Sequence, residues 1–296
     1  MGIMEQNNHT EFEEQEQGVM DEPTLKKVVR KGDFPSFFDL VVMLFIVVFS
    51  QLVVGAVAVA LGLEMPEVTS GEVADIERFI AALVLRGENF AIIYPTSMIV
   101  AFGLLLLYVR FRDGEGRIAR VSTRGFDPTV ILGGLLWMIS MQVVVEPLSL
   151  LLPTVHQQSG QGFWAIMTAV VFAPVFEEFI FRGVILEAML RRHRRSFSVV
   201  VTSLLFAVVH FEPSVMFTAF VSGLVLGTVY LHTSSIFSTI ILHAINNAIA
   251  YSLITLNVDN YSYREVLGAG QTYYIVYAIC FVFSVFAVIR TWRRRR

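Results

Sequence analysis

Three ionisable side chains interrupt a long apolar run in the middle of the chain. The stretch "VVFAPVFEEFIFRGVILEAML", residues 170–190, contains Glu177, Glu178 and Arg182 among hydrophobic residues. Glu178 and Arg182 are four residues apart, which on a helix places them on one face in the favourable order of acid before base. We therefore predict that these two pair, and that Glu177, rotated by about 100° from its neighbour, is left free for acid–base chemistry.

Two later apolar stretches each supply one histidine. "FAVVH" ends in His210, and "HAINN" begins with His243, with Asn247 four residues later on the same helical face. A single buried histidine is most often a hydrogen-bonded core residue, but two in separate spans beside an unpaired glutamate indicate a shared site. Asn246 lies about 100° off the His243 face, so Asn247 is the expected partner of that histidine.

A membrane bundle is needed to position these groups, because 55% of the 296 residues are hydrophobic and only 16% are charged. Crossing the hydrocarbon of a bilayer takes about 20 apolar residues. The sequence therefore predicts an all-α polytopic membrane protein of about eight transmembrane helices, with the polar groups inside the helical bundle. The eight segments are residues 37–63, 90–109, 129–152, 163–190, 197–211, 215–231, 236–256 and 273–289, of which the fifth and sixth are short.

Basic residues flank the predicted spans in a regular order. They gather before the first span and after the second, fourth and eighth, in residues 26–31, 110–124, 191–195 and 290–296. With eight spans all four clusters lie on one side, which the positive-inside rule assigns to the cytoplasm. We expect a multi-pass protein of the plasma membrane with both termini in the cytoplasm.

The predicted domain organisation follows from composition. Residues 1–35 form an expected disordered, acidic cytoplasmic tail with a basic flank, because their Glu- and Gln-rich start has few large apolar residues. Residues 36–292 form the transmembrane domain, with the polar motifs within about 163–256, and residues 293–296 form a basic cytoplasmic end. The single cysteine, Cys280, excludes an internal disulfide.

The predicted position of Glu177, near the middle of a membrane span, makes its charge energetically costly. Counted along a helix, it lies roughly 20 Å from either end of its span. A charge near the bilayer centre costs about 2.5–3.5 kcal/mol on insertion scales, so buried ionisable residues in membrane proteins are usually functional. A purely structural polar network is the alternative explanation of the cluster.

The motifs "EEFIFR" (177–182), "FAVVH" (206–210) and "HAINN" (243–247) resemble EExxxR, FxxxH and HxxxN. These three motifs, in this order on successive spans, are those of the CPBP family (CAAX protease and bacteriocin-processing, Abi) of intramembrane endopeptidases. The resemblance covers about residues 163–256 and implies an all-helical membrane protease with its active site inside the bundle.

The resemblance also implies roles for the site residues. Glu177 with His210 would activate a water molecule, His243 and Asn247 would stabilise the oxyanion, and Glu178 with Arg182 would support the helix. The family has also been described as metal-dependent, and Glu177, His210 and His243 could supply the ligands of a zinc ion. The chain contains no HExxH motif, and we favour a metal-free mechanism.

Other functional classes stay open at this point. A proton-coupled transporter or channel would use Glu177, His210 and His243 as a proton relay. A non-catalytic immunity or scaffold protein could share the fold. For an endopeptidase, the expected partners are membrane lipid and a peptide or protein substrate, which can be lipidated or carry a leader, and no nucleic acid.

Overall fold

The computed structural model describes residues 34–62, 90–113, 126–152, 162–211, 213–256, 262–268 and 270–293. These residues form helices and short connections, without a strand among them. The predicted disordered tail, except for its last two residues, lies outside the described residues, and so does the basic end after residue 293.

All eight predicted segments coincide with helices. The first three are α2 (Phe37–Ala60), α4 (Phe90–Asp113) and α5 (Pro128–Ser149). The fourth is one helical stretch whose parts are α6 (Phe163–Ile166), η1 (Met167–Phe172), α7 (Ala173–Glu178), η2 (Phe179–Leu186) and α8 (Glu187–Leu190), where η1 and η2 are π-helical. The others are α9 (Arg195–Val208), α10 (Pro213–Thr233), α11 (Ile236–Thr255) and α13 (Gln271–Arg293), with the short α12 (Tyr263–Val266) before the last.

The fold class is confirmed as an all-α, polytopic membrane architecture, and the predicted number of spans is approximate. Among the described residues, six helices are long and apolar enough to cross a membrane, namely α2, α4, α5, α10, α11 and α13. The stretch from α6 to α8 is divided by its two π-helical segments, and α9 has only 14 residues.

Local sequence signals set where several helices begin. Ser36 caps α2 in a reciprocal capping box with Asp39, which satisfies two backbone N–H groups at once. Asp127 caps α5, where Pro128 occupies the first turn and needs no hydrogen-bond partner. Ser235 caps α11. These caps set the residue at which each helix begins, which a long apolar sequence does not specify by itself.

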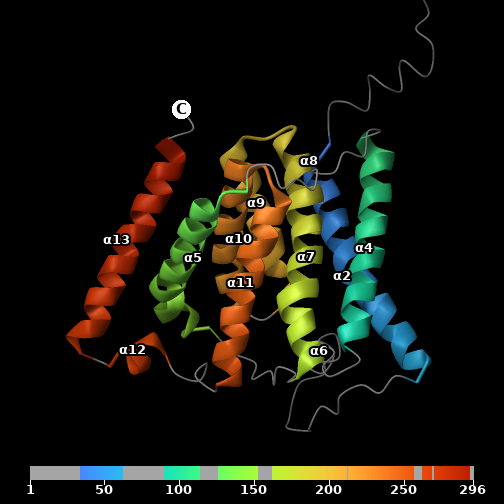
Figure 1. Ribbon diagram of the computed structural model, residues 1–296. Helices are drawn as coiled ribbons and strands as arrows, with labels where there is room; N and C mark the ends of the chain where they lie inside the picture. The colour runs from blue at the N-terminus through green and yellow to red at the C-terminus, as the bar shows by residue number, and fades with distance from the viewer. Residues whose placement is uncertain are drawn as a thin grey trace, which may run out of the picture.

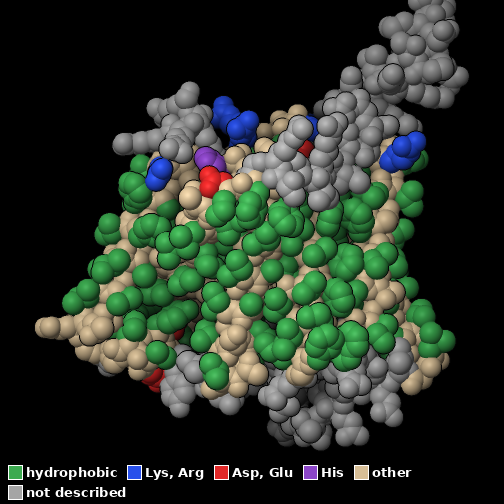
Figure 2. Space-filling model, in the orientation of Figure 1, with side chains coloured by type: hydrophobic (Ala, Val, Ile, Leu, Met, Phe, Trp, Pro, Cys, Tyr) green, Lys and Arg blue, Asp and Glu red, His purple; other side chains and the backbone are tan. Residues whose placement is uncertain are grey.

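The helices stand side by side, and the basic helix ends lie on one side of the bundle (Figure 1). The start of α2 and the ends of α4, α8 and α13 are all at the upper side of this view. Figure 2 shows hydrophobic side chains over the middle of one face, with Lys and Arg at its upper edge. This arrangement agrees with the alternation of basic loops that the sequence predicts.

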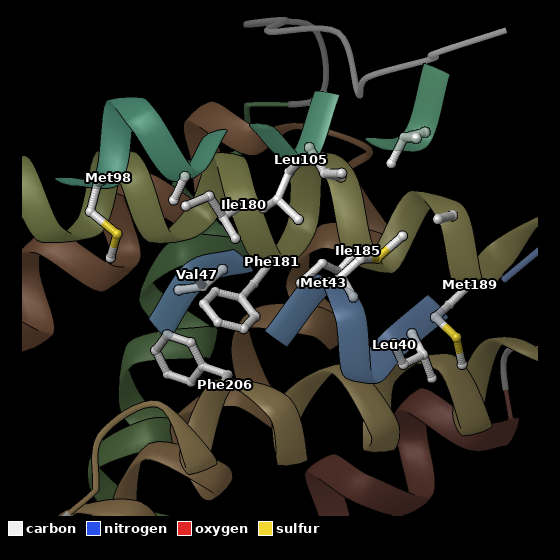
Figure 3. Packing of buried hydrophobic residues seen from close by; sticks show 14 of the residues in the cluster. Leu40, Met43, Val47, Met98, Leu105, Ile180, Phe181, Ile185, Met189 and Phe206 are labelled. Carbon is white, nitrogen blue, oxygen red and sulfur yellow. The ribbon is translucent and has the colours of Figure 1, made fainter. Parts of the chain in front are cut away.

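The helical stretch from α6 to α8 lies at the centre of the packing. It contacts α4 on one side and α9 and α11 on others. A core cluster joins it to α2, α4 and α9, and Figure 3 shows Met43, Leu105, Ile180, Phe181 and Phe206 among its members. The central helix is therefore enclosed by protein where its charged residues occur, and Glu178 is fully buried.

Two glycines allow α9 and α10 to approach closely. A Cβ atom at Gly223 would lie 3.0 Å from Cβ and 3.1 Å from Cα of Ser203. At Gly227 a Cβ would lie 3.0 Å from Cγ1 of Val199. Because these distances are shorter than ordinary carbon–carbon contacts, a larger residue at either position requires Ser203 or Val199 on α9 to shift.

Candidate active site

The π-helical segment η1 leaves one backbone carbonyl without a partner in its own helix. The N–H of Ala173 donates to Thr168, five residues earlier, rather than to Ala169. The next residue, Pro174, has no N–H, so it cannot donate to Ala169 either. The side-chain nitrogen of Asn247 instead donates to the Ala169 carbonyl at 2.9 Å. An irregularity in one helix thus holds the side chain of another, as π-helical turns often do at functional sites.

The predicted pair of Glu178 and Arg182 is present. Nη1 of Arg182 donates to Oε1 of Glu178 at 2.7 Å, and Nη2 donates to the carbonyl of Gly223 at 3.2 Å. The guanidinium carbon also lies 4.8 Å from the ring centroid of Phe206, a cation–π arrangement. Arg182 is only 1% exposed, so these three contacts replace the water that its charge has lost.

Glu178 has a second partner that the sequence did not reveal, His243. Nδ1 of His243 lies 3.0 Å from Oε1 of Glu178. A carboxylate paired with arginine can only accept, so Nδ1 carries a proton and donates it to this bond. The bond orients the imidazole ring and places its Nε2 3.8 Å from Oε2 of Glu177. This separation is too long for a direct hydrogen bond.

Glu177 is held by a residue that sequence reasoning missed. The hydroxyl of Tyr94 on α4 donates to Oε1 of Glu177 at 2.6 Å, and the glutamate is 8% exposed. The prediction that Glu177 would lack the Arg182 partner holds, but the carboxylate is not free. The sequence does contain one indication of this contact. Tyr94 precedes the apolar residues Met98 and Leu105 at helical spacing, and the structure shows that these two residues lie on a buried face of α4.

His210 lies just beyond the C-terminal end of α9. Its Nδ1 is 2.7 Å from the carbonyl of Phe206, and since a carbonyl only accepts, Nδ1 carries the proton. In the neutral ring, Nε2 then holds the lone pair. The next residue, Phe211, has φ 57°, a left-handed conformation that does not continue the helix. Among the described residues no hydrogen bond joins His210 to Glu177.

The imidazole rings of the two histidines both contact the ring of Phe206. The centroid of Phe206 is 4.9 Å from that of His210 and 5.9 Å from that of His243, both in edge-to-face geometry. Since Arg182 also lies over this ring, Phe206 contacts three of the predicted site residues. The ring therefore fixes the spacing of the two imidazoles and excludes water from the space that it fills.

Asn247 is also supported by side chains from α5 and α11. Nε2 of Gln142 donates to Oδ1 of Asn246 at 2.9 Å. Nδ2 of Asn246 is 3.5 Å from Oδ1 of Asn247, at the limit of a hydrogen bond. The prediction that Asn246 lies off the His243 face agrees with its partner on α5. Its position makes it a link between α5 and the amide of Asn247.

The comparison with known proteins identifies the part of the chain that carries this site. Residues 159–249 match the family model described as type II CAAX prenyl endopeptidase Rce1-like. The family resemblance is confirmed. The matched segment includes all three motifs, and the family that it matches is one of endopeptidases. No curated protein and no solved structure matches the chain.

The resemblance to the CPBP family raises the question of whether the site residues could bind a zinc ion. Glu177, His210 and His243 are of the types that bind zinc, and both rings are held at Nδ1, as metal-binding histidines often are. In the described part of the chain, however, no three His, Cys, Asp or Glu side chains lie close enough together to hold a metal ion. These donors do not fit a metal in this arrangement, and we derive no step through one.

Two site contacts come from outside the Rce1-like segment. Tyr94, on α4, holds the carboxylate of Glu177, and Gln142, on α5, holds the amide of Asn246. The Rce1-like segment therefore supplies the ionisable groups, while helices that precede it in the chain supply neutral hydrogen-bond donors.

Proposed function

We propose that this protein is an intramembrane endopeptidase that hydrolyses a peptide bond near or within the membrane, with Glu177 as the general base. The observation that carries the proposal is the environment of Glu177. It is buried in the middle of its helix and takes no part in the ion pair between Glu178 and Arg182. Its two oxygens instead meet Tyr94 and His243. Burying a carboxylate at this depth is costly, and Glu177 forms no ion pair with the arginine of its own helix that would explain its presence.

The reaction we propose begins with a water molecule between Glu177 and Nε2 of His210. Oε2 of Glu177 takes a proton from this water while the water oxygen forms a bond to the carbonyl carbon of the substrate. The π electrons of that carbonyl move to its oxygen, which becomes the oxyanion. Glu177 then gives the proton to the amide nitrogen, the C–N bond breaks, and a carboxylic acid and an amine leave.

His243 is proposed as one donor to the oxyanion. Its Nδ1–H is already given to Glu178, so a bond from Nε2 requires that the ring carry both protons. The resulting positive charge is stabilised by the adjacent carboxylates of Glu177 and Glu178. In this account Glu178 does more than neutralise Arg182, because it also orients the histidine that contacts the reacting oxygen.

Asn247 is proposed as the second donor. One of its two amide N–H groups is given to the carbonyl of Ala169, which fixes the nitrogen on the side of the central helix. The other N–H is the one that donates to the oxyanion. A donor of this kind contributes about 3–4 kcal/mol to the stability of the transition state.

We also propose that the protein is in the plasma membrane with both termini in the cytoplasm. The grouping of the basic helix ends on one side of the bundle supports this orientation (Figure 2). The substrate we infer is a membrane-associated peptide or protein that carries a lipid or a leader, since a base enclosed among apolar helices is reached most readily from the lipid phase.

The test uses purified protein in liposomes with three peptides: a farnesylated peptide ending in a CAAX sequence, the same peptide without the lipid, and a leader peptide. Mass spectrometry measures cleavage, and a pH-sensitive dye inside the liposomes measures proton flux. We expect cleavage of a peptide without proton flux. Proton flux without cleavage would contradict the proposal and support the relay, and the absence of both would indicate a non-catalytic protein.

A further inference from the structure

The contact between Tyr94 and Glu177 indicates a role for a residue outside the Rce1-like segment. We propose that Tyr94 is a positioning residue, which holds Oε1 of Glu177 so that Oε2 faces His243 and the reacting water. This inference rests on the proposed function of Glu177 as the base. Tyr94 acts through Glu177 and needs no contact with the substrate.

The need for such a residue follows from the freedom of a glutamate side chain. The last torsion of glutamate is broad, so its two oxygens exchange places easily unless one of them is held. Among the side chains that the structure describes, Tyr94 alone donates a hydrogen bond to Glu177. At 2.6 Å the bond has the length of a strong O–H···O⁻ interaction. It therefore makes the two oxygens of Glu177 different, one bound by the phenol and one directed toward His243 at 3.8 Å.

The packing of α4 keeps the phenol in place. Met98, Ala101 and Leu105 follow Tyr94 at helical spacing and are buried in the core cluster with Ile180 of the central helix. Figure 3 shows Met98, Leu105 and Ile180 in this cluster. Because α4 contacts η1, α7 and η2, the ring of Tyr94 approaches Glu177 from a surface that is already packed. A rigid helix, rather than a loop, thus presents the donor.

The same helix offers a matched control in Tyr108. Its hydroxyl donates to Oδ1 of Asp39 at 2.6 Å, the same length as the bond from Tyr94 to Glu177. Asp39 is a fully buried carboxylate on α2, and it also receives hydrogen bonds from Arg112. Tyr108 lies about 21 Å along the helix from Tyr94, so its bond joins helices without contact to the site.

The experiment compares Tyr94→Phe with Tyr108→Phe in the liposome cleavage assay. Each change removes one hydroxyl from the same helix and keeps the ring. We expect Tyr94→Phe to lower kcat about 10- to 100-fold with little change in KM, because the lost bond acts on the base during chemistry. Tyr108→Phe should lower thermal stability and leave kcat within about twofold. An unchanged kcat in Tyr94→Phe, or an equal loss in both variants, would overturn the proposal.

A second measurement keeps this inference separate from the proposed function. Thermal unfolding in detergent is compared for Tyr94→Phe in the natural protein and in a Glu177→Met background, where the carboxylate that accepts the bond is absent. We expect the loss of Tm caused by Tyr94→Phe to be smaller in that background, which supports the contact even if no tested peptide is cleaved. An equal loss in both backgrounds would show that the phenol does not hold Glu177 and would contradict the inference.

Discussion

Replacing Glu178 by glutamine should lower the free energy of unfolding more than any other conservative substitution at the centre of the bundle. The change keeps the size of the side chain but removes the negative charge that faces Arg182 at 2.7 Å. The glutamine oxygen can still accept a hydrogen bond from the guanidinium, but it carries no charge, and the other contacts of Arg182, the carbonyl of Gly223 and the ring of Phe206, are neutral as well. Because Arg182 is 1% exposed, water cannot reach it to replace the lost carboxylate.

The expected loss follows from this burial. Breaking a buried ion pair by removing one partner costs about 3–5 kcal/mol, because an uncompensated charge stays in the interior. Replacing both partners by neutral groups costs much less. The double variant Glu178→Gln/Arg182→Met should therefore recover all but about 1 kcal/mol of the free energy of unfolding.

Equilibrium unfolding in detergent checks this prediction, with Glu187→Gln as the control. Glu187 lies on the same helical stretch and accepts a hydrogen bond from Tyr230, which a glutamine oxygen can also accept. The control should therefore lose less than about 1 kcal/mol. If Glu178→Gln were as stable as the control, or if the double variant were less stable than Glu178→Gln, the ion pair would not be the structural element that we describe.

Three further outcomes are expected. Gly223→Ala should lower the free energy of unfolding by about 1–3 kcal/mol through contact with Ser203, whereas Gly103→Ala, where a Cβ meets nothing within 4 Å, should not; thermal unfolding compares the two. Asn247→Ala should lower kcat about 100-fold or more, measured by peptide cleavage, and a loss of less than tenfold would remove it from the oxyanion site. A strong chelator should leave cleavage unchanged, and stoichiometric zinc lost together with activity, by metal analysis of the purified protein, would contradict the metal-free mechanism.

Much of the architecture could be predicted from the sequence, because its signals are local. Apolar runs of the right length gave all eight helices, and the spacing of four residues gave the pair of Glu178 and Arg182. The number of full-length spans could not be predicted from these signals alone, since six of the helices are long and apolar enough to cross a membrane among the described residues. A run such as residues 163–190 has the composition of one helix, but composition does not reveal the π-helical segments inside it.

The contacts between helices could not be predicted in the same way. The bonds from Tyr94 to Glu177 and from His243 to Glu178 join residues 83 and 65 positions apart, and no periodicity within one helix specifies such a pair. The acceptor of Asn247 depends on a register change at Ala169 that only the backbone reveals. The one signal was a tyrosine in an apolar helix, at a position that the structure shows to be partly buried, since its hydroxyl needs a partner there.

The central claim is that Glu177 is the base of a peptidase, and peptide cleavage by Glu177→Gln tests it most directly. Purified natural protein, Glu177→Gln and Glu187→Gln are compared in liposomes under single-turnover conditions, with thermal unfolding as a check that each is folded. The account predicts that Glu177→Gln is folded and loses cleavage by a factor of about 1,000 or more, while Glu187→Gln cleaves at the natural rate. Cleavage by a folded Glu177→Gln at a rate close to that of the natural protein would contradict it.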